Sequence, residues 1–379
     1  MENSGSLPER NGQGPAHESF RGKDLTRALA DSIAREAEGL GPLRLMHVCG
    51  THERSVNRFG IRSLLPPNVK IVAGPGCPVC VCPVSDLLAA RELALRHGVI
   101  LASFGDMLAV PMPGGSLLDA RREGADVRAV YSVLDVLALA RDRPDREVVF
   151  FSIGFETTTA PTAAAVASLD RDALPNFSLI SSNRVVPEAL DFLLASKELS
   201  VDGLILPGHV SVIIGTGVYR FLVDRFGIPC AVAGFEPVDM LEAIRVLLAQ
   251  KRSGRAEVHN SYSRAVLPEG NLRAKSLMAE VYERRDAVWR GMGVLPGTGL
   301  FLRPGFAFRD ALEKFGIEPC GEDEESAAGC LCPRVMTGLA EPEECRLYGS
   351  VCRPTSPVGP CMVSEEGTCR IRFEFGGTE

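Results

Sequence analysis

Short apolar runs that alternate with helical segments constrain this chain more than any other feature of its sequence. The runs 69–73, 148–153 and 228–233 are each followed by glycine and then by a segment with helical spacing of apolar residues. Such runs are typical of parallel strands covered by helices on both faces. We therefore predict an α/β fold with two parallel-sheet domains that flank a cleft, and a small irregular cysteine-rich domain after them.

The same pattern suggests where the domains begin and end. We expect a disordered tail over residues 1–24, a first α/β domain over 25–122, a second over 123–252, and a cysteine-rich domain over 253–379. The cleft between the two α/β domains is the expected ligand site. The last segment has few apolar runs, so it needs another source of stability, and a metal centre supplies one.

Charge and hydropathy exclude several classes of protein. The formal net charge of −7 argues against a nucleic-acid partner, because binding to phosphates needs a basic surface. No apolar run approaches the roughly 18–20 residues of a membrane span. Residues 1–17 have no basic segment followed by an apolar core, so they are not a secretory signal. We expect a cytoplasmic protein that binds neither nucleic acid nor membrane.

Three cysteines fall within six positions of the loop after the predicted strand 69–73. Cys77 and Cys80 form a Cys-Pro-Val-Cys motif where that strand passes into a helix. Backbone N–H groups at a helix start favour a thiolate, so this pair suits either redox exchange or soft-metal binding. A zinc site would need further ligands, which Cys49 with Cys82 or His52 could provide. Cys82 is otherwise a bystander.

The segment Cys49-Gly-Thr-His-Glu53 follows the strand 43–48. Cys49 with His52 fits a nucleophile and its base, or a pair of ligands for iron or zinc. A core cysteine beside a helix-capping Thr51 is the structural alternative, and the local sequence does not decide between them. Because both loops follow strand ends, we expect Cys49 to lie close to Cys77 and Cys80.

Three further polar residues occupy strand ends. Glu156 and Glu236 each follow a Gly-Phe pair, and His209 stands in Pro-Gly-His-Val-Ser. Each glutamate suits a base, a hydrogen-bond acceptor or a helix-terminal charge. We predict that all three are site residues.

Seven of the twelve cysteines lie between residues 320 and 369. The four that we select as ligands of a [4Fe-4S] cluster are Cys330, Cys345, Cys352 and Cys369. Irregular backbone that carries four thiolates suits such a cluster, although zinc fits the same donors. Cys332 and Cys361 compete for the same roles, and spacing alone does not choose among them.

Taken together, these motifs closely resemble one family, the hydrogenase maturation factor HypD. The matching segments are Cys49-Gly-Thr-His-Glu53, Gly74-Pro-Gly-Cys-Pro-Val-Cys80, Gly154-Phe-Glu-Thr-Thr158, Pro207-Gly-His-Val-Ser211, Gly234-Phe-Glu-Pro237 and Val358-Gly-Pro-Cys-Met-Val-Ser364. The resemblance covers residues 25 to 372. It departs at Pro333, where we expect glycine after the second cysteine of the Cys-x-Cys pair, and Cys82 is additional.

The resemblance implies a role in building the Fe(CN)2CO unit of [NiFe]-hydrogenases. It implies a complex with the chaperone HypC, and cyanide delivered by HypE after charging by HypF. Cys49 would be the ligand of the iron in that unit, His52 would position or protonate the site, and Cys77 with Cys80 would be the redox pair. The [4Fe-4S] cluster would exchange electrons with that pair.

Two other functions remain compatible with the residues alone. A thiol-disulfide oxidoreductase with a structural metal needs only Cys77 and Cys80. A binding module whose cysteines hold zinc needs no redox chemistry.

Overall fold

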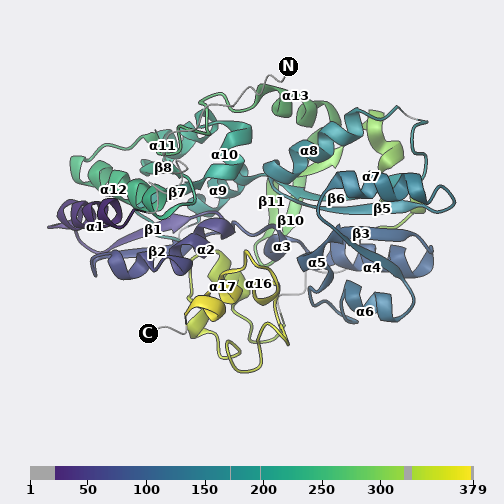
Figure 1. Ribbon diagram of the computed structural model, residues 1–379, viewed down its shortest axis with the longest axis horizontal. Coiled ribbons are helices and arrows are strands. Elements are labelled where there is room, and N and C mark those ends of the chain that lie inside the picture. Colours follow the sequence, from purple (N-terminus) through teal and green to yellow (C-terminus); the bar gives the residue numbers. More distant parts are fainter. Residues whose placement is uncertain (1–21, 171, 197, 320–326, 377–379) are drawn as a thin grey trace, which may run out of the picture.

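The strands of this computed structural model form two sheets that lie side by side along the longest axis of the molecule (Figure 1). The structure describes residues 22–170, 172–196, 198–319 and 327–376. The first sheet has the order β2-β1-β7-β8-β9 and is parallel throughout. Its strands are β1 (Leu43–His47), β2 (Val69–Ala73), β7 (Gly203–Pro207), β8 (Cys230–Ala233) and β9 (Val258–Asn260).

The second sheet has the order β10-β11-β6-β5-β3-β4. Its strands are β3 (Ile100–Phe104), β4 (Asp126–Val130), β5 (Val148–Gly154), β6 (Phe177–Arg184), β10 (Tyr282–Trp289) and β11 (Gly293–Leu302). Strands β3 to β6 pair in parallel, whereas β11 runs antiparallel to both β6 and β10. Every residue of β5 is buried, as expected for a parallel strand covered on both faces.

The predicted α/β architecture is confirmed, but the two sheets do not follow the predicted boundaries. The first sheet joins strands from 43–73 to strands from 203–260, and the second joins 100–184 to 282–302. The boundary expected between residues 122 and 123 therefore falls inside the second sheet, and the hairpin β10–β11 belongs to that sheet rather than to a cysteine-rich domain. Local sequence marks strands, but the partner of each strand depends on long crossovers. Most of the tail expected over 1–24 lies outside the described residues.

Helices cover both sheets. They are α1 (Lys23–Ala37), α2 (Gly50–Arg58), α3 (Pro78–Val81), α4 (Val84–Arg96), α5 (Gly105–Leu108), α6 (Leu117–Arg122), α7 (Val133–Asp142), α8 (Glu156–Ala167), α9 (Val186–Ala195), α10 (Gly208–Ile214), α11 (Arg220–Phe226), α12 (Pro237–Ser253), α13 (Leu272–Val281), α14 (Ala311–Phe315), α15 (Cys332–Met336), α16 (Pro360–Val363) and α17 (Thr368–Phe375). Within the described ranges, none of them is both long and apolar enough to cross a membrane.

The apolar core has three parts. Helices α1 and α12 pack on one face of the first sheet, and α7 and α8 pack on one face of the second. The remaining faces of both sheets share a single core, in which Leu206 of β7 and Phe151 of β5 belong to one cluster with α4 and α9. The two halves are therefore joined by buried apolar contacts rather than by a linker.

The cysteine-rich segment packs against the carboxyl edge of the first sheet. Figure 1 shows it in yellow below α2 and α3. Helix α17 contacts α2, and α16 contacts α3. The backbone of Glu366 approaches Gly50 so closely that a Cβ at Gly50 would lie 2.5 Å from the Glu366 carbonyl oxygen. This contact requires glycine, and it brings the cysteine-rich segment to the N-terminus of α2.

Candidate functional site

Cys49 and Cys77 each begin a helix at the same edge of the first sheet. Cys49 is the N-cap residue of α2, and Cys77 is the N-cap residue of α3. Their strands β1 and β2 are parallel neighbours that end in register, with His47 opposite Ala73. The parallel pairing therefore places both loops at one edge, as predicted.

The two loops touch through a glycine. The amide of Gly50 donates to the carbonyl of Gly76 over 3.1 Å. A Cβ at Gly76 would lie 2.3 Å from the Cys49 nitrogen, closer than any side chain allows. The glycine before Cys77 is thus explained by the backbone of Cys49, which packs directly on it.

Cys77 and Cys80 form a disulfide in the structure, with their Cα atoms 5.3 Å apart. Both residues are buried. The Cα separation lies in the ordinary range for a disulfide, so the Cys-Pro-Val-Cys turn accommodates the bond without moving the backbone. The sequence predicted that these two cysteines act together, in redox exchange or as soft-metal ligands, and the disulfide shows that their sulfur atoms lie within bonding distance.

Three thiol-bearing segments meet at one small cavity, which we name the thiol cavity. It is lined by His47, Cys49, Gly50, Gly74, Gly76, Cys77, Cys80, Met336, Cys361, Glu366 and Thr368. Its volume of about 10 Å³ leaves room for no more than about one water molecule. The expectation that Cys49 lies close to Cys77 and Cys80 is confirmed, and Cys361 adds a thiol from the cysteine-rich segment.

The Cys49 thiol is held in its neutral form. Burial, and to a smaller extent the neighbouring Glu366 carboxylate, raise its pKa to about 12, although the backbone amides of His52 and Thr51 act in the opposite direction. Glu366 is itself partly buried, and its Oε1 accepts a hydrogen bond from the Thr51 hydroxyl over 3.2 Å. A positive metal ion bound by Cys49 would reverse this balance, because it stabilises a thiolate.

Sequence reasoning missed His47, which also lines the thiol cavity. Its Nε2 lies 2.7 Å from Glu53 Oε2, and its buried Nδ1 has no hydrogen-bond partner among the described residues. Glu53 in turn contacts Arg62 at 2.9 Å and Arg372 of α17 at 3.4 Å. The sequence did contain a signal for this residue, because His47 is the last residue of the strand and stands two positions before Cys49.

His52, His209 and Glu236 do not line the thiol cavity. The Nε2 atom of His52 lies 3.2 Å from the Ala233 carbonyl oxygen. Phe235 separates the two histidines, with ring centroids 4.9 Å from His52 and 3.8 Å from His209. Burial and the nearby His47 lower the pKa of His52 to about 3, so this ring is neutral. Glu236 is the N-cap residue of α12.

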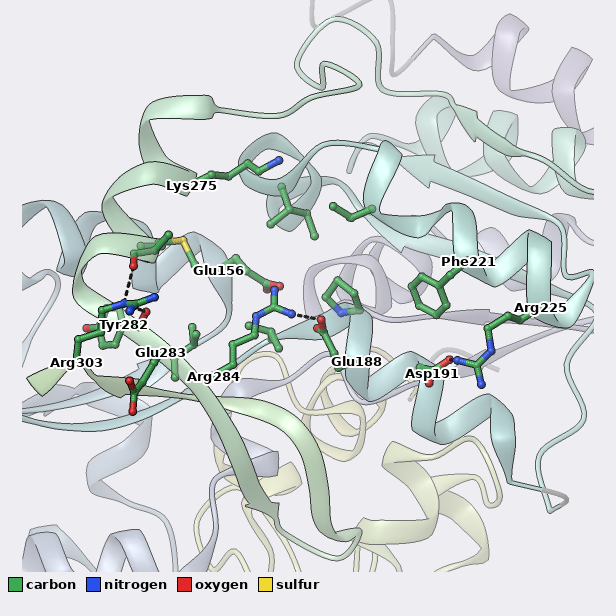
Figure 2. Close-up of a pocket in the computed structure, with 17 residues that line it drawn as sticks. Glu156, Glu188, Asp191, Phe221, Arg225, Lys275, Tyr282, Glu283, Arg284 and Arg303 are labelled. Carbon is green, nitrogen blue, oxygen red and sulfur yellow. Dashed lines mark hydrogen bonds and ion pairs between the residues drawn. The ribbon is translucent and has the colours of Figure 1, made fainter.

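Glu156 lies apart from both groups, at the first residue of α8. It lines a cavity of about 770 Å³ between α9, α11, α13 and the hairpin β10–β11 (Figure 2). Burial raises its pKa to about 7. The seven predicted catalytic residues thus fall into three places, and only Cys49, Cys77 and Cys80 share the thiol cavity.

The cysteine-rich segment brings six thiols together. Their positions are Cys330, Cys332, Cys345, Cys352, Cys361 and Cys369. The thiols of Cys332 and Cys369 both contact that of Cys361, and Cys330 lies within electrostatic range of Cys345 and Cys352. The amides of Val358 and Cys369 donate to Cys352 Sγ at 3.4 Å and Cys361 Sγ at 3.2 Å. Cys320 lies outside the described residues.

The thiols of this segment are the kind of donor that an iron–sulfur cluster uses. Within the described ranges, no group of three or more Cys, His, Asp or Glu residues is placed to hold one metal ion. In a cubane cluster each thiolate binds a different iron, so the four sulfur atoms need not converge on one point. Six mostly buried thiols on irregular backbone, some already accepting amide hydrogen bonds, fit a group of that kind.

A buried disulfide, a free thiol and a cysteine-rich segment that meet at the carboxyl edge of a parallel sheet define an α/β protein with a thiol-rich site. The family model described as "HypD: Hydrogenase formation hypA family" matches residues 24–376. The chain belongs to the HypD family.

Curated relatives match over nearly their whole length. The hydrogenase maturation factor HypD of Azotobacter vinelandii is 46% identical over 366 residues, covering 95% of this chain and 96% of the relative. HypD of Rhodobacter capsulatus is 43% identical, covering 94% and 97%, and HypD of Cupriavidus necator is 40% identical, covering 95% and 96%. The match to a solved structure, the D-threo-3-hydroxyaspartate dehydratase from Delftia sp. HT23, covers 77% of this chain and 85% of that protein at 12% identity. Its TM-score of 0.15 is too low to indicate a shared fold.

Proposed function

We propose that this chain is a hydrogenase maturation factor that, together with HypC, assembles the Fe(CN)2CO unit of [NiFe]-hydrogenases. Cyanide would arrive from HypE, which HypF charges. Membership of the HypD family and the names of the relatives support the role in maturation. One observation carries the chemistry: Cys49, the Cys77–Cys80 disulfide and Cys361 line the same buried cavity.

In this proposal Cys49 holds the iron of the substrate unit. Its thiol occupies the N-terminus of α2, where two backbone amides and the Thr51 hydroxyl favour a thiolate once a metal displaces the proton. His47 Nδ1 and the Glu366 carboxylate line the same cavity and supply further polar groups beside the iron.

The Cys77–Cys80 pair stores two electrons in its reduced, dithiol form. Reduction of the disulfide consumes two electrons and two protons and yields the Cys77 and Cys80 thiols, and reoxidation returns both. Because the pair lies beside Cys49, the dithiol form would hold these electrons where iron would be bound.

We further propose that Cys330, Cys345, Cys352 and Cys369 hold a [4Fe-4S] cluster. Cys330 lies near Cys345 and Cys352, and Cys369 lies near Cys330 and Cys352, as ligands of one cluster must; Cys332 also lies near Cys330 and Cys369. When bound, such a cluster supplies one-electron redox chemistry. Cys361 is then left free to line the thiol cavity.

The size of the thiol cavity implies that the site opens. An iron atom with three diatomic ligands does not fit in about 10 Å³. Two segments form the lid: the α3 loop and the cysteine-rich segment, which contacts it through α16. We infer that binding of HypC or reduction of the disulfide separates them.

The burial of the disulfide argues against a thiol-disulfide oxidoreductase that acts on protein substrates. Cys80 has no exposed surface and Cys77 has 6%. Exchange requires a thiolate to reach one of the sulfur atoms in line. A folded protein substrate cannot approach either sulfur atom in this arrangement.

Infrared spectroscopy of the complex with HypC tests the proposal. The complex purified without oxygen should show stretching bands of iron-bound cyanide and CO, and Cys49→Ala should abolish them. Cys230→Ala is the matched control, because Cys230 is also a buried free thiol but lies in β8 outside the cavity. Bands that persist unchanged in Cys49→Ala would remove Cys49 as the iron ligand.

A further inference from the structure

The cavity that contains Glu156 is separate from the thiol cavity, and the chemistry proposed above makes no use of it. We name it the Glu156 cavity; besides Glu156, its wall includes Phe221, Lys275, Met278, Tyr282 and Arg303 (Figure 2). No residue lines both cavities. Its volume of about 770 Å³ falls in the range of pockets that hold small organic ligands, roughly 300–1,000 Å³.

Three buried polar atoms of residues that line this cavity have no hydrogen-bond partner among the described residues. They are Glu156 Oε2, the Tyr282 hydroxyl and Glu188 Oε2; Glu156 and Tyr282 are 1% and 2% exposed, and Glu188 is half-buried. Glu156 Oε1 is satisfied by the amide of Val186 over 3.1 Å, which fixes the direction of the carboxyl group. Buried polar groups are nearly always paired in folded proteins, so these unpaired atoms beside one cavity indicate a missing partner.

Two cations of the cavity wall contact carbonyl oxygens rather than carboxylates, although the carboxyl groups of Glu156 and Glu283 also line the cavity. Lys275 Nζ contacts the Glu269 carbonyl oxygen at 3.1 Å, and Arg303 Nε contacts the carbonyls of Ala279 and Tyr282. Among the described residues, neither side chain forms an ion pair with a carboxylate. The other two cations of the wall do, since Arg284 pairs with Glu188 and Arg225 with Asp191.

We propose that the Glu156 cavity binds a small organic anion with an apolar or aromatic body. The carboxylate or phosphate group of the ligand would lie against Lys275, its body against Phe221 and Met278, and its polar substituents against Glu156 and the Tyr282 hydroxyl. The proposal does not depend on iron, cyanide or the disulfide. Its failure would therefore leave the proposed maturation function untouched.

Protonation of Glu156 should control this binding. Glu188, Arg284 and Tyr219 interact with it, Lys275 and Tyr282 line the same cavity, and burial raises the pKa of Glu156 to about 7. Below that pH the carboxyl group is neutral and donates a hydrogen bond to the ligand. Above it, the carboxylate repels an anion, so affinity should fall as the pH rises through 7.

A fluorescence titration of the full-length protein with 8-anilinonaphthalene-1-sulfonate tests the proposal, because this probe joins an anionic group to an aromatic body. We expect saturable binding to one site. Benzoate and phenyl phosphate, added as competitors, distinguish a carboxylate ligand from a phosphate ligand. If none of the three compounds binds saturably, the proposal is overturned.

Charge reversal localises the binding. Lys275→Glu should weaken binding by about tenfold or more, as expected when a charged contact is lost. Lys23→Glu makes the same change on the exposed surface of α1 and should leave the affinity unchanged.

Two further variants test the cavity and its carboxyl group. Met278→Trp keeps the charge but fills the cavity, so it should block binding. Glu156→Gln should remove the loss of affinity above pH 7. Wild-type affinity in both Lys275→Glu and Met278→Trp would contradict the proposal.

Discussion

Glu53 is the most tightly held charge of the site. It is fully buried, and it contacts His47, Arg62 and Arg372 from three different segments. Burial alone would raise the pKa of its carboxyl group, but the positive charge of Arg62, the hydrogen bond from His47 and Arg372 together lower it far below its ordinary value of 4.5. A carboxylate paired in this way is costly to neutralise.

We predict that Glu53→Gln lowers the free energy of unfolding by about 3 kcal/mol at neutral pH, because it leaves buried cationic partners without their counter-charge. Chemical denaturation measures this loss. Glu92→Gln is the matched control, since Glu92 pairs with Arg96 on the exposed face of α4 and should contribute less than about 1 kcal/mol. Equal losses in the two variants would contradict the prediction.

The same residue predicts a pH dependence. A carboxyl group whose pKa is depressed in the folded state contributes its full stabilisation above the unfolded pKa, and this is lost as the pH falls through the folded pKa. The stability difference between the wild type and Glu53→Gln should therefore be constant above about pH 4.5 and shrink below it. A difference that grows on acidification would refute the assignment.

Substitution of two neighbouring cysteines distinguishes a cluster ligand from a residue that only lines the thiol cavity. Cys369 and Cys361 are both buried and share a hydrogen bond from the Cys369 amide to Cys361 Sγ. Under the proposed ligand set, Cys369→Ser should lose the broad visible absorption and most of the roughly four irons per chain, whereas Cys361→Ser should keep them. Absorption and iron analysis after anaerobic purification decide the matter. The reverse result would exchange their roles.

At the scale of elements, close backbone contacts hold the site together. Gly50 lies against Glu366, Gly76 against Cys49, and Gly367 against the Cys361 carbonyl. Each contact is too short for a side chain. The loops of β1, β2 and the cysteine-rich segment therefore form one packed unit.

We predict that Gly76→Ala forces the α3 loop away from Cys49 and costs about 1–3 kcal/mol of stability, as overpacked sites do. Faster reduction of the Cys77–Cys80 disulfide by dithiothreitol should accompany the loss, because the thiol cavity opens. Gly105→Ala serves as the control, since a Cβ at that position meets nothing within 4 Å. An unchanged reduction rate in Gly76→Ala would show that the contact does not shield the disulfide.

In the whole molecule, both sheets include strands from the last third of the chain. The hairpin β10–β11 pairs with β6, and β9 pairs with β8, so residues beyond 252 contribute to both sheets. The two sheets also share one apolar core. This arrangement is that of one cooperative unit rather than separable domains.

We therefore predict that a fragment covering residues 22–252 fails to fold, whereas 22–319, which keeps all strands β1 to β11, retains the sheets. Circular dichroism with thermal unfolding distinguishes the two outcomes. A cooperative transition in the 22–252 fragment would show that the boundary expected from the sequence is a true domain boundary.

The local sequence predicted the strands 43–48, 69–73, 148–153 and 228–233 and the loops after them, but not the hairpin β10–β11. These predictions use local properties: β5 is recognisable because nearly all of its residues are apolar, and Cys77 begins a helix because a strand, glycine and proline precede its motif. The short Cys-Pro-Val-Cys spacing likewise indicated that Cys77 and Cys80 act together, in redox exchange or as metal ligands.

Which loops meet depends on the folding of the whole chain. The order of parallel strands placed β7 beside β1, although 155 residues lie between His47 and Gly203, and packing of α17 on α2 brought Cys361 and Glu366 to Cys49. The tertiary structure also divided the predicted residues, leaving His52 and His209 around Phe235 and Glu156 in a cavity of its own. The physical reason is that strand order and the packing of distant segments depend on surfaces that exist only once the whole chain has folded.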